Sequence, residues 1–205
     1  MTRVPRSARV SLLVIAALLA AAQAYAARFS ADAVKAAFLF RFASYIDWPE
    51  DAVSDGPFVI AVYGAEGVAR QLDVLQPKMT AHDRPAQVRR ITRVSELDGV
   101  QILYVGPTQP LVDSRALRAA AIERPILIVT DDEYGLDAGG VINFLEEPRN
   151  VRFEVSLAAA DRARLKIAAA LLSVAARVER RPQAALNCGA PELRQRDPAC
   201  NNATP

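Results

Sequence analysis

Residues with the chemistry for catalysis are few in this chain. His82 is the sole histidine, so a catalytic triad or a histidine metal site would have to use it alone. It lies in the turn-rich segment 80–85, where an exposed loop histidine is the ordinary interpretation. The sequence holds no G-x-S-x-G elbow, no P-loop and no H-E-x-x-H motif. We therefore expect no enzymatic activity, no cofactor and no metal site.

A run of acids offers a second kind of chemistry. Asp131, Asp132 and Glu133 follow a predicted strand, at the carboxyl end where open α/β sheets bind ligands. Three adjacent acids cannot all point inward, so a solvated loop is favoured over a metal site. Gly64 and Gly106 end two other predicted strands. Together with Asp131 and Asp132 they mark the ligand site of an alternative function, the binding of a small molecule.

Segment 139–157 predicts a β-hairpin whose turn contains Pro148. Counting outward from a four-residue turn at 147–150 fixes the register of the two strands. The predicted pairs are Phe144 with Phe153, Ile142 with Val155, Asn143 with Glu154, and Leu145 with Arg152. One face of this hairpin is therefore apolar, and the other carries an amide, a carboxylate and a guanidinium.

The polar face of the hairpin has two interpretations. Asn143, Arg152 and Glu154 could together recognise a ligand or a partner protein. Alternatively, Arg152 and Glu154 form an ion pair and Asn143 hydrogen-bonds to Glu154, as half-exposed antiparallel strands commonly show. The structural interpretation is favoured, and the choice stays open at this point.

Short apolar strands alternate with helical patterns through the middle of the chain. This order predicts an α/β fold: a mixed, largely parallel sheet flanked by helices, with a C-terminal antiparallel hairpin and a long packing helix. The expected strands cover 58–63, 88–91, 100–105 and 126–130, and the expected helices cover 68–75, 111–122 and 158–180. The last helix should pack on the sheet and expose only a narrow cationic stripe.

The first predicted helix follows Ser30 as its N-cap and stops before the Trp48-Pro49 pair. It is apolar nearly all round, and its aromatic side chains include Phe38, Phe42 and Tyr45. Such a helix is either buried within the fold or shared with a partner, which includes a second copy of the chain. The buried alternative is the commoner cause of this pattern.

The first 26 residues have the pattern of a cleaved signal peptide. Arg3, Arg6 and Arg9 precede an apolar stretch and an Ala-Tyr-Ala cleavage pattern, and the apolar stretch is too short to span a bilayer. We expect export to the periplasm without membrane insertion of the mature chain. Three of the 25 basic residues leave with this segment, so 22 remain against 23 acids, near −1. That balance argues against a nucleic-acid partner.

The remaining chain suits one domain, at 27–181, followed by an irregular tail at 182–205. The tail contains both cysteines, Cys188 and Cys200. In an oxidising compartment this pair most simply forms one disulfide, which would stiffen the tail.

Several of these segments together resemble the YfiR-like family of exported bacterial proteins. The similar segments are VKAAFLFRFASYIDWP, FVIAVYG, ILIVTDDEYG, GGVINF and VRFEVSLAAADRARLKIAAALLSVA, spread over about 29–178. The most specific parts are Trp48-Pro49 and the pairing of GGVINF with Arg152-Phe153-Glu154. Cysteines that relatives place within the domain are missing here.

The resemblance implies a periplasmic α/β regulator without enzymatic activity. Its best-known relatives restrain an inner-membrane diguanylate cyclase, which lowers cyclic-di-GMP output and biofilm formation. We expect a partner of that kind or a histidine kinase. The predicted contact residues are the aromatic ones of the first helix and its end, and the polar ones of the hairpin: Phe38, Phe42, Tyr45, Trp48, Asn143, Arg152 and Glu154.

Overall fold

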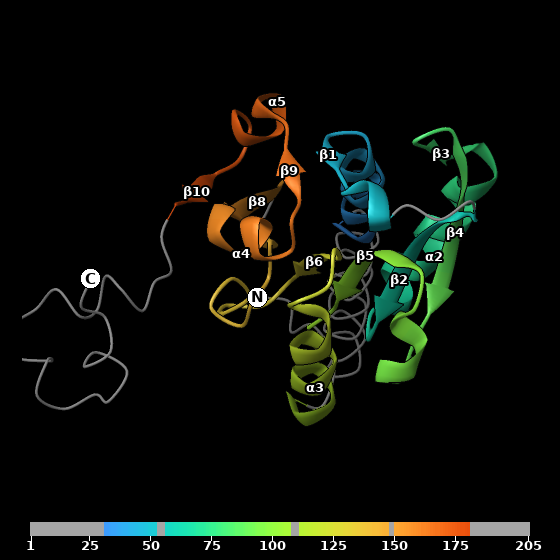
Figure 1. Cartoon of the computed structure of the whole chain (residues 1–205), viewed down its shortest axis with the longest axis horizontal. Helices are drawn as coiled ribbons and strands as arrows, with labels where there is room; N and C mark the ends of the chain where they lie inside the picture. The colour runs from blue at the N-terminus through green and yellow to red at the C-terminus, as the bar shows by residue number, and fades with distance from the viewer. Residues whose placement is uncertain (1–30, 53–55, 108–110, 148–149, 181–205) are drawn as a thin grey trace, which may run out of the picture.

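One mixed sheet organises the part of the chain that the structure describes. The computed structural model describes residues 31–52, 56–107, 111–147 and 150–180 (Figure 1). Within these ranges the main sheet has the strand order β10-β8-β7-β6-β5-β2-β4-β3. Its strands are β2 (Phe58–Tyr63), β3 (Thr80–Ala81), β4 (Arg84–Arg90), β5 (Val100–Val105), β6 (Leu127–Thr130), β7 (Ile142–Glu147), β8 (Asn150–Ser156) and β10 (Arg177–Glu179).

The strands from β4 to β7 run parallel to one another, and β8 runs antiparallel to β7. At the two edges, β10 is parallel to β8 and β3 is antiparallel to β4. Every residue of β2 and β5 is buried, as expected of strands that are covered on both faces. The predicted α/β class, with a largely parallel sheet and an antiparallel hairpin, is confirmed.

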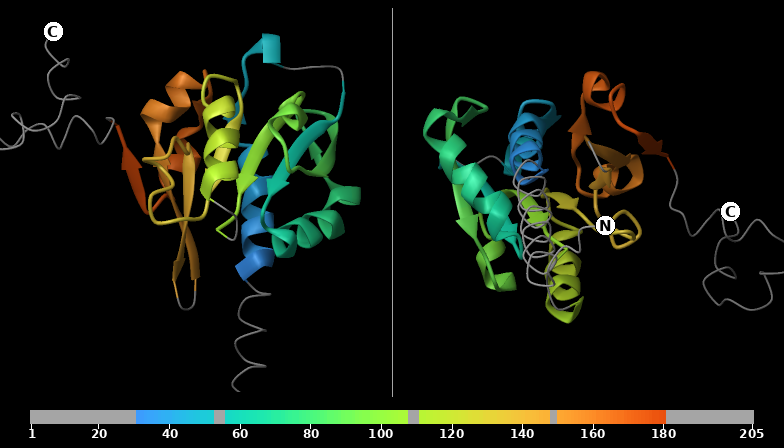
Figure 2. Two further views of the ribbon diagram at one scale, coloured as in Figure 1. Left: turned by 90° about the horizontal axis from the view of Figure 1, so that it is seen from below. Right: turned by 180° about the vertical axis from the view of Figure 1, so that it is seen from behind.

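Helices cover both faces of this sheet. A first helix at 31–43 is followed by α2 (Glu66–Leu75), α3 (Leu111–Ala121), α4 (Leu157–Arg162) and α5 (Ala169–Leu172), with short 3-10 turns η1 (Glu50–Ala52), η2 (Gln76–Lys78) and η3 (Val94–Leu97). The first helix and α2 pack in one apolar cluster, and α3 packs in the other. In Figure 2 the first helix, in blue, lies between α2 and the orange C-terminal segment.

The order of the strands creates a topological switch point between β2 and β5. The chain leaves β2 through α2 toward β4 on one side, and it leaves β5 through α3 toward β6 on the other. Because the two helices lie on opposite faces, a crevice opens at the carboxyl ends of these strands. Gly106 allows the two loops to meet there, since a Cβ at this residue would lie 2.8 Å from the Gly64 carbonyl oxygen.

The hairpin has the predicted register. Phe144 pairs with Phe153, and Asn143 pairs with Glu154 across β7 and β8. The remaining predicted pairs, Ile142 with Val155 and Leu145 with Arg152, are also observed. The apolar alternation and the turn length were therefore sufficient to fix the pairing of these strands.

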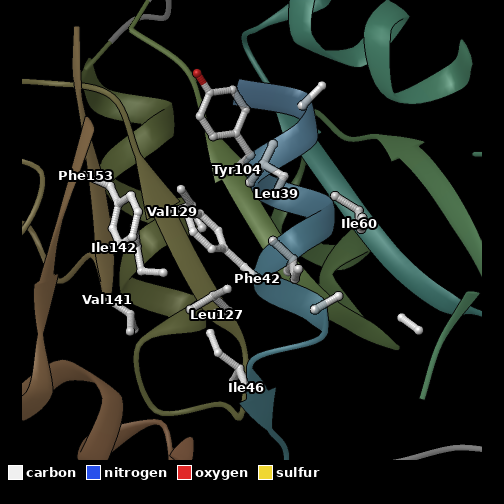
Figure 3. Close-up of a cluster of buried hydrophobic side chains, with 14 of the residues drawn as sticks. Leu39, Phe42, Ile46, Ile60, Tyr104, Leu127, Val129, Val141, Ile142 and Phe153 are labelled. Atoms are coloured by element: carbon white, nitrogen blue, oxygen red, sulfur yellow. The ribbon is translucent and has the colours of Figure 1, made fainter. Parts of the chain in front are cut away.

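The first helix is part of the core. Leu39 and Phe42 are fully buried, and Phe42 has its ring centroid 5.2 Å from that of Phe153 and 5.9 Å from that of Phe144. Figure 3 shows the helix laid across the sheet with these side chains directed into the cluster. The helix ends at residue 43, earlier than predicted, because Ile46–Asp47 forms strand β1.

The predicted long helix at 158–180 is wrong. Helix α4 ends at Arg162, where the amide of Leu165 donates to the Ala160 carbonyl and that of Arg164 donates to the Asp161 carbonyl. This is the Schellman pattern, with Arg164 at a φ of 56°. Strand β9 (Lys166–Ile167) then pairs antiparallel with β1.

The predicted signal segment at 1–26 and the tail with Cys188 and Cys200 lie outside the described residues. Within the described ranges, no helix combines the length and the apolar character that crossing a bilayer requires.

The packing of the first helix gives a direct prediction for stability. Phe42→Ala should lower the free energy of unfolding by about 3–5 kcal/mol, because it removes a fully buried ring that packs against three other aromatic rings. Urea denaturation measures this loss. Val34→Ala, at a more exposed position of the same helix, is the control and should cost below about 1 kcal/mol. A Phe42→Ala loss as small as the control would contradict the buried position of this helix.

Candidate functional site

A polar pocket lies at the switch point, on the side of the first helix. It has a volume of about 490 Å³, within the size range of small-molecule sites. The first helix, the start of α2 and the carboxyl ends of β5, β6 and β7 supply its walls. Its lining residues are Ala31, Asp32, Lys35, Ala65, Gly67, Val68, Tyr104, Pro107, Asp131 and Glu146.

Lys35 is the central charged group of this pocket. Its ammonium donates to the Asp131 carboxylate at 2.6 Å and to the Glu146 carboxylate at 2.8 Å. Lys35 and Asp131 are both more than nine-tenths buried, so this is an ion pair shielded from water. The Tyr104 hydroxyl also donates to Asp131, at 3.0 Å. Figure 3 shows Tyr104 with its hydroxyl directed away from the apolar cluster.

Protonation in this cluster follows from its contacts. Burial by itself would lower the pKa of Lys35, but the hydrogen bonds to Asp131 and Glu146 outweigh burial and raise that pKa. Burial raises the pKa of the Tyr104 hydroxyl, and the neighbouring Asp131 charge raises it further. Lys35 therefore stays a cation and Tyr104 a neutral donor at ordinary pH.

Asp32 faces the same pocket in a different environment. Burial raises the pKa of its carboxyl, and Glu146 and Asp131 add to this effect against the opposing charges of Lys35 and Arg70. Gly67 leaves room for it, since a Cβ at that residue would overlap the Asp32 carboxylate. The ionised form of Asp32 therefore costs folding free energy.

A second pocket, of about 880 Å³, lies on the α3 side of the crevice. The buried Arg118 donates to Asp132 at 2.9 Å in its wall. The loop at 132–138 and the backbone at Gly106 complete this wall. The α3 helix and the β6–β7 loop are thereby tied together.

The alternative ligand residues are brought close to these pockets. Asp131 lines the first pocket, while Gly106 and Asp132 line the second. Gly64 lines neither pocket. Its carbonyl oxygen lies close to Gly106, and its own φ is 70°. The predicted ligand residues therefore lie in or beside the pockets at the strand ends, and their role in ligand binding stays a prediction. Nothing in the strand-end pattern identified Lys35.

The polar face of the hairpin is mostly internal. Asn143 donates to Glu154 at 3.0 Å, and both side chains are buried. The Glu154 carboxylate accepts from Arg177 at 2.7 Å, whereas Arg152 reaches Glu147 at 3.9 Å. The predicted hydrogen bond is present, but the ion pair uses Arg177 in place of Arg152.

Burial also separates the predicted contact residues of the first helix. Phe42 is fully buried and Trp48 is 9% exposed, whereas Phe38 and Tyr45 are partly buried. Arg152 is half-exposed on β8. Direct contact with a partner therefore remains open to Phe38, Tyr45 and Arg152, while Phe42, Trp48, Asn143 and Glu154 support the fold.

His82 is an exposed turn residue with a structural contact. It connects β3 to β4 at a φ of 50°, and its Nε2 donates to the Ala43 carbonyl at 2.8 Å. Its ring lies 5.6 Å from Trp48 and 6.0 Å from Phe58, measured between centroids. The residue thus anchors the turn to the end of the first helix.

The polar site residues that the sequence reasoning missed are Asp32, Lys35, Tyr104 and Glu146. A signal was present, because Lys35 is the only charged residue between Asp32 and Arg41 in an otherwise apolar helix. A buried lysine requires an anionic partner, and a search for one would have led to the acids at 131–133. No cluster of acidic, histidine or cysteine side chains arranged to hold a metal ion occurs among the described residues.

The fold and this crevice define an α/β protein with a ligand-sized polar pocket at a topological switch point. Comparison with known protein families matches residues 32–176 to the YfiR/HmsC-like family. The match covers most of the chain, so the protein belongs to that family. A comparison with curated proteins gave no match.

The raised pKa of Asp32 predicts a pH-dependent stability difference. Asp32→Asn should increase the free energy of unfolding at pH 7, because it removes a carboxylate whose ionisation opposes folding. The gain should shrink as the pH falls through the folded-state pKa and vanish below the ordinary value of 3.8. Urea denaturation across this pH range measures it.

The matched control is Asp161→Asn, the same change at an exposed position of α4. It should alter the free energy of unfolding by no more than about 0.5 kcal/mol at neutral pH. A loss of stability in Asp32→Asn at pH 7 would contradict the environment described for this carboxyl.

Proposed function

We propose that the protein is an exported regulator that binds the periplasmic portion of an inner-membrane signalling protein and represses it. A diguanylate cyclase or a histidine kinase is the expected kind of partner. Membership in the YfiR/HmsC-like family supports a periplasmic regulator of cyclic-di-GMP signalling. The signal-peptide pattern of residues 1–26 is consistent with this location.

The observation that carries the proposal is a largely apolar segment at 167–176, half of whose residues are exposed. Its sequence, IAAALLSVAA, contains no charged residue. Instead of forming one long packed helix, it begins at the last residue of β9 and contains the short α5 at one end of the molecule (Figure 1). Val174 is 65% exposed, and Ala168, Ala169 and Ala170 are also exposed.

This exposure points to a protein partner. Leu171 is buried and Ile167, Leu172 and Ala175 pack against the core, so the exposed apolar surface of this segment comes from Ala168, Ala169, Ala170 and Val174. Apolar groups gathered on a surface mark contact sites for proteins or membranes. The segment is also firmly built into the fold: Leu171 is buried, and the Ala176 amide donates to the Phe153 carbonyl at 2.7 Å. A preformed surface loses little conformational entropy when it binds.

Charged groups border the apolar segment and can orient the partner. Lys166 precedes it and Arg177 follows it, and both are exposed. Arg152 lies on β8 of the hairpin, whose two strands extend toward the lower end of the left view in Figure 2. We retain Arg152, Phe38 and Tyr45 as further proposed contacts.

Repression requires a difference in affinity between two states of the partner. If the protein binds the inactive state more tightly, it shifts the population toward that state. Equal affinity for both states would produce binding without regulation. The proposal therefore predicts that conditions that activate the partner also weaken the complex.

Val174→Asp should weaken partner binding at least about tenfold, because it places a charge in the centre of an apolar contact. Its folding should be nearly unchanged, since the side chain is exposed. Biolayer interferometry with the isolated periplasmic domain of a candidate cyclase measures the affinity, and urea denaturation measures the stability.

Val74→Asp is the matched control, because Val74 is 72% exposed on α2, outside the proposed surface. It should bind the candidate like the unchanged chain. Equal affinities of Val174→Asp and the unchanged chain would remove segment 167–176 from the interface. Equal weakening by both variants would show that added negative charge, and not this surface, is responsible.

A further inference from the structure

The polar pocket beside the first helix contains more negative than positive charge. Asp32, Asp131 and Glu146 line it, and Lys35 is the single cation among its lining residues. Lys35 contacts both Asp131 and Glu146, so at most one of these charges is neutralised. Arg70, whose charge also acts on Asp32, is not among the lining residues and contacts Glu66 at 3.7 Å on the exposed face of α2. The pocket therefore favours a cation and disfavours an anion.

Packing accounts for part of this cluster but leaves Asp32 unexplained. Asp131 receives hydrogen bonds from Lys35 and Tyr104, which satisfy a buried carboxylate and tie the first helix to β5 and β6. Asp32 lines the cavity instead, and its ionised form opposes folding. A charge that destabilises the fold and faces a cavity is typical of functional sites.

The position of the cavity gives an independent reason to expect a ligand. It opens at the carboxyl ends of β2, β5 and β6, where the connections of β2 and β5 diverge. Open α/β sheets bind ligands at such switch points because loops from adjacent strands separate there. The volume of about 490 Å³ suits a small molecule, not a bare ion.

We propose that this pocket binds a small organic cation, a compact amine or guanidine, whose charged group lies between Asp32 and Glu146. An organic cation fits both the excess negative charge and the volume. The described residues hold no acidic cluster with the arrangement of a metal site, which sets this ligand class apart from metal ions. The pocket shares no residue with the 167–176 segment, so this site goes beyond the proposed partner binding.

Isothermal titration calorimetry of the purified chain with three four-carbon probes tests the ligand class. 1,4-Diaminobutane is the cation, 1,4-butanediol is the neutral analogue and succinate is the anion. Saturable one-to-one binding is expected for the diamine alone. Binding of the diol or of succinate with equal affinity would overturn the proposal, and so would the absence of diamine binding.

Variants test whether binding occurs in this pocket. Asp32→Asn and Glu146→Gln should each weaken diamine binding about tenfold or more, because each removes a charged hydrogen-bond acceptor. Asp161→Asn removes one negative charge from an exposed position of α4 and should leave the affinity unchanged. Equal weakening by all three variants would show only non-specific attraction to an acidic surface, which overturns the proposal.

A fourth variant blocks the pocket without changing its charge. Gly67→Ala places a methyl group against the Asp32 carboxylate and should displace it. We expect this variant to lose diamine binding. Its affinity for the periplasmic domain of the candidate cyclase, which we attribute to the surface around Val174, should be unchanged. Diamine binding unaffected by Gly67→Ala would contradict a ligand position beside Asp32. Because the two sites are measured separately, failure of one proposal is distinguishable from failure of the other.

Discussion

The buried ion pair between Lys35 and Asp131 is the interaction on which this architecture depends. Burying two charges is costly unless each is paired and hydrogen-bonded, and here Tyr104 and Glu146 complete the cluster. The pair fixes the first helix against the carboxyl end of the sheet while aromatic packing around Phe42 holds its other turns. The same helix therefore covers the apolar core with its C-terminal half and forms a wall of the polar pocket with its first turns.

The elements whose pattern of apolar residues and turns lies within a short stretch of sequence were predictable. The hairpin at 139–157 has apolar alternation and a short turn, so the register follows from nearby residues alone. The predicted helix at 158–180 fails because its Ala- and Leu-rich sequence favours helix locally. Pairing of β9 with β1, from a segment far away in the sequence, overrides that preference. Because that helix does not form, Ala168, Ala169, Ala170 and Val174 lie exposed on the surface that we propose as the partner contact.

The side-chain partners were less predictable than the strands. Glu154 was expected to pair with Arg152 on the same strand, but Arg177 from edge strand β10 takes that position. This contact depends on where the chain goes after α5, which the hairpin sequence does not contain. Lys35 likewise has its partners at 131 and 146, about a hundred residues away. Family resemblance indicated the class of protein, whereas these long-range side-chain contacts became visible only in the three-dimensional structure.

The central claim is that the apolar surface at 167–176 contacts a membrane signalling protein. Site-specific photo-crosslinking tests it most directly, with a photoreactive residue at Val174 or at Val74 of the exported chain in living cells. The account predicts an adduct from Val174 that contains an inner-membrane protein with a cyclase or kinase output domain, and no such adduct from Val74. The same adduct from both positions, or adducts from Val174 that contain only a second copy of this chain, would contradict it.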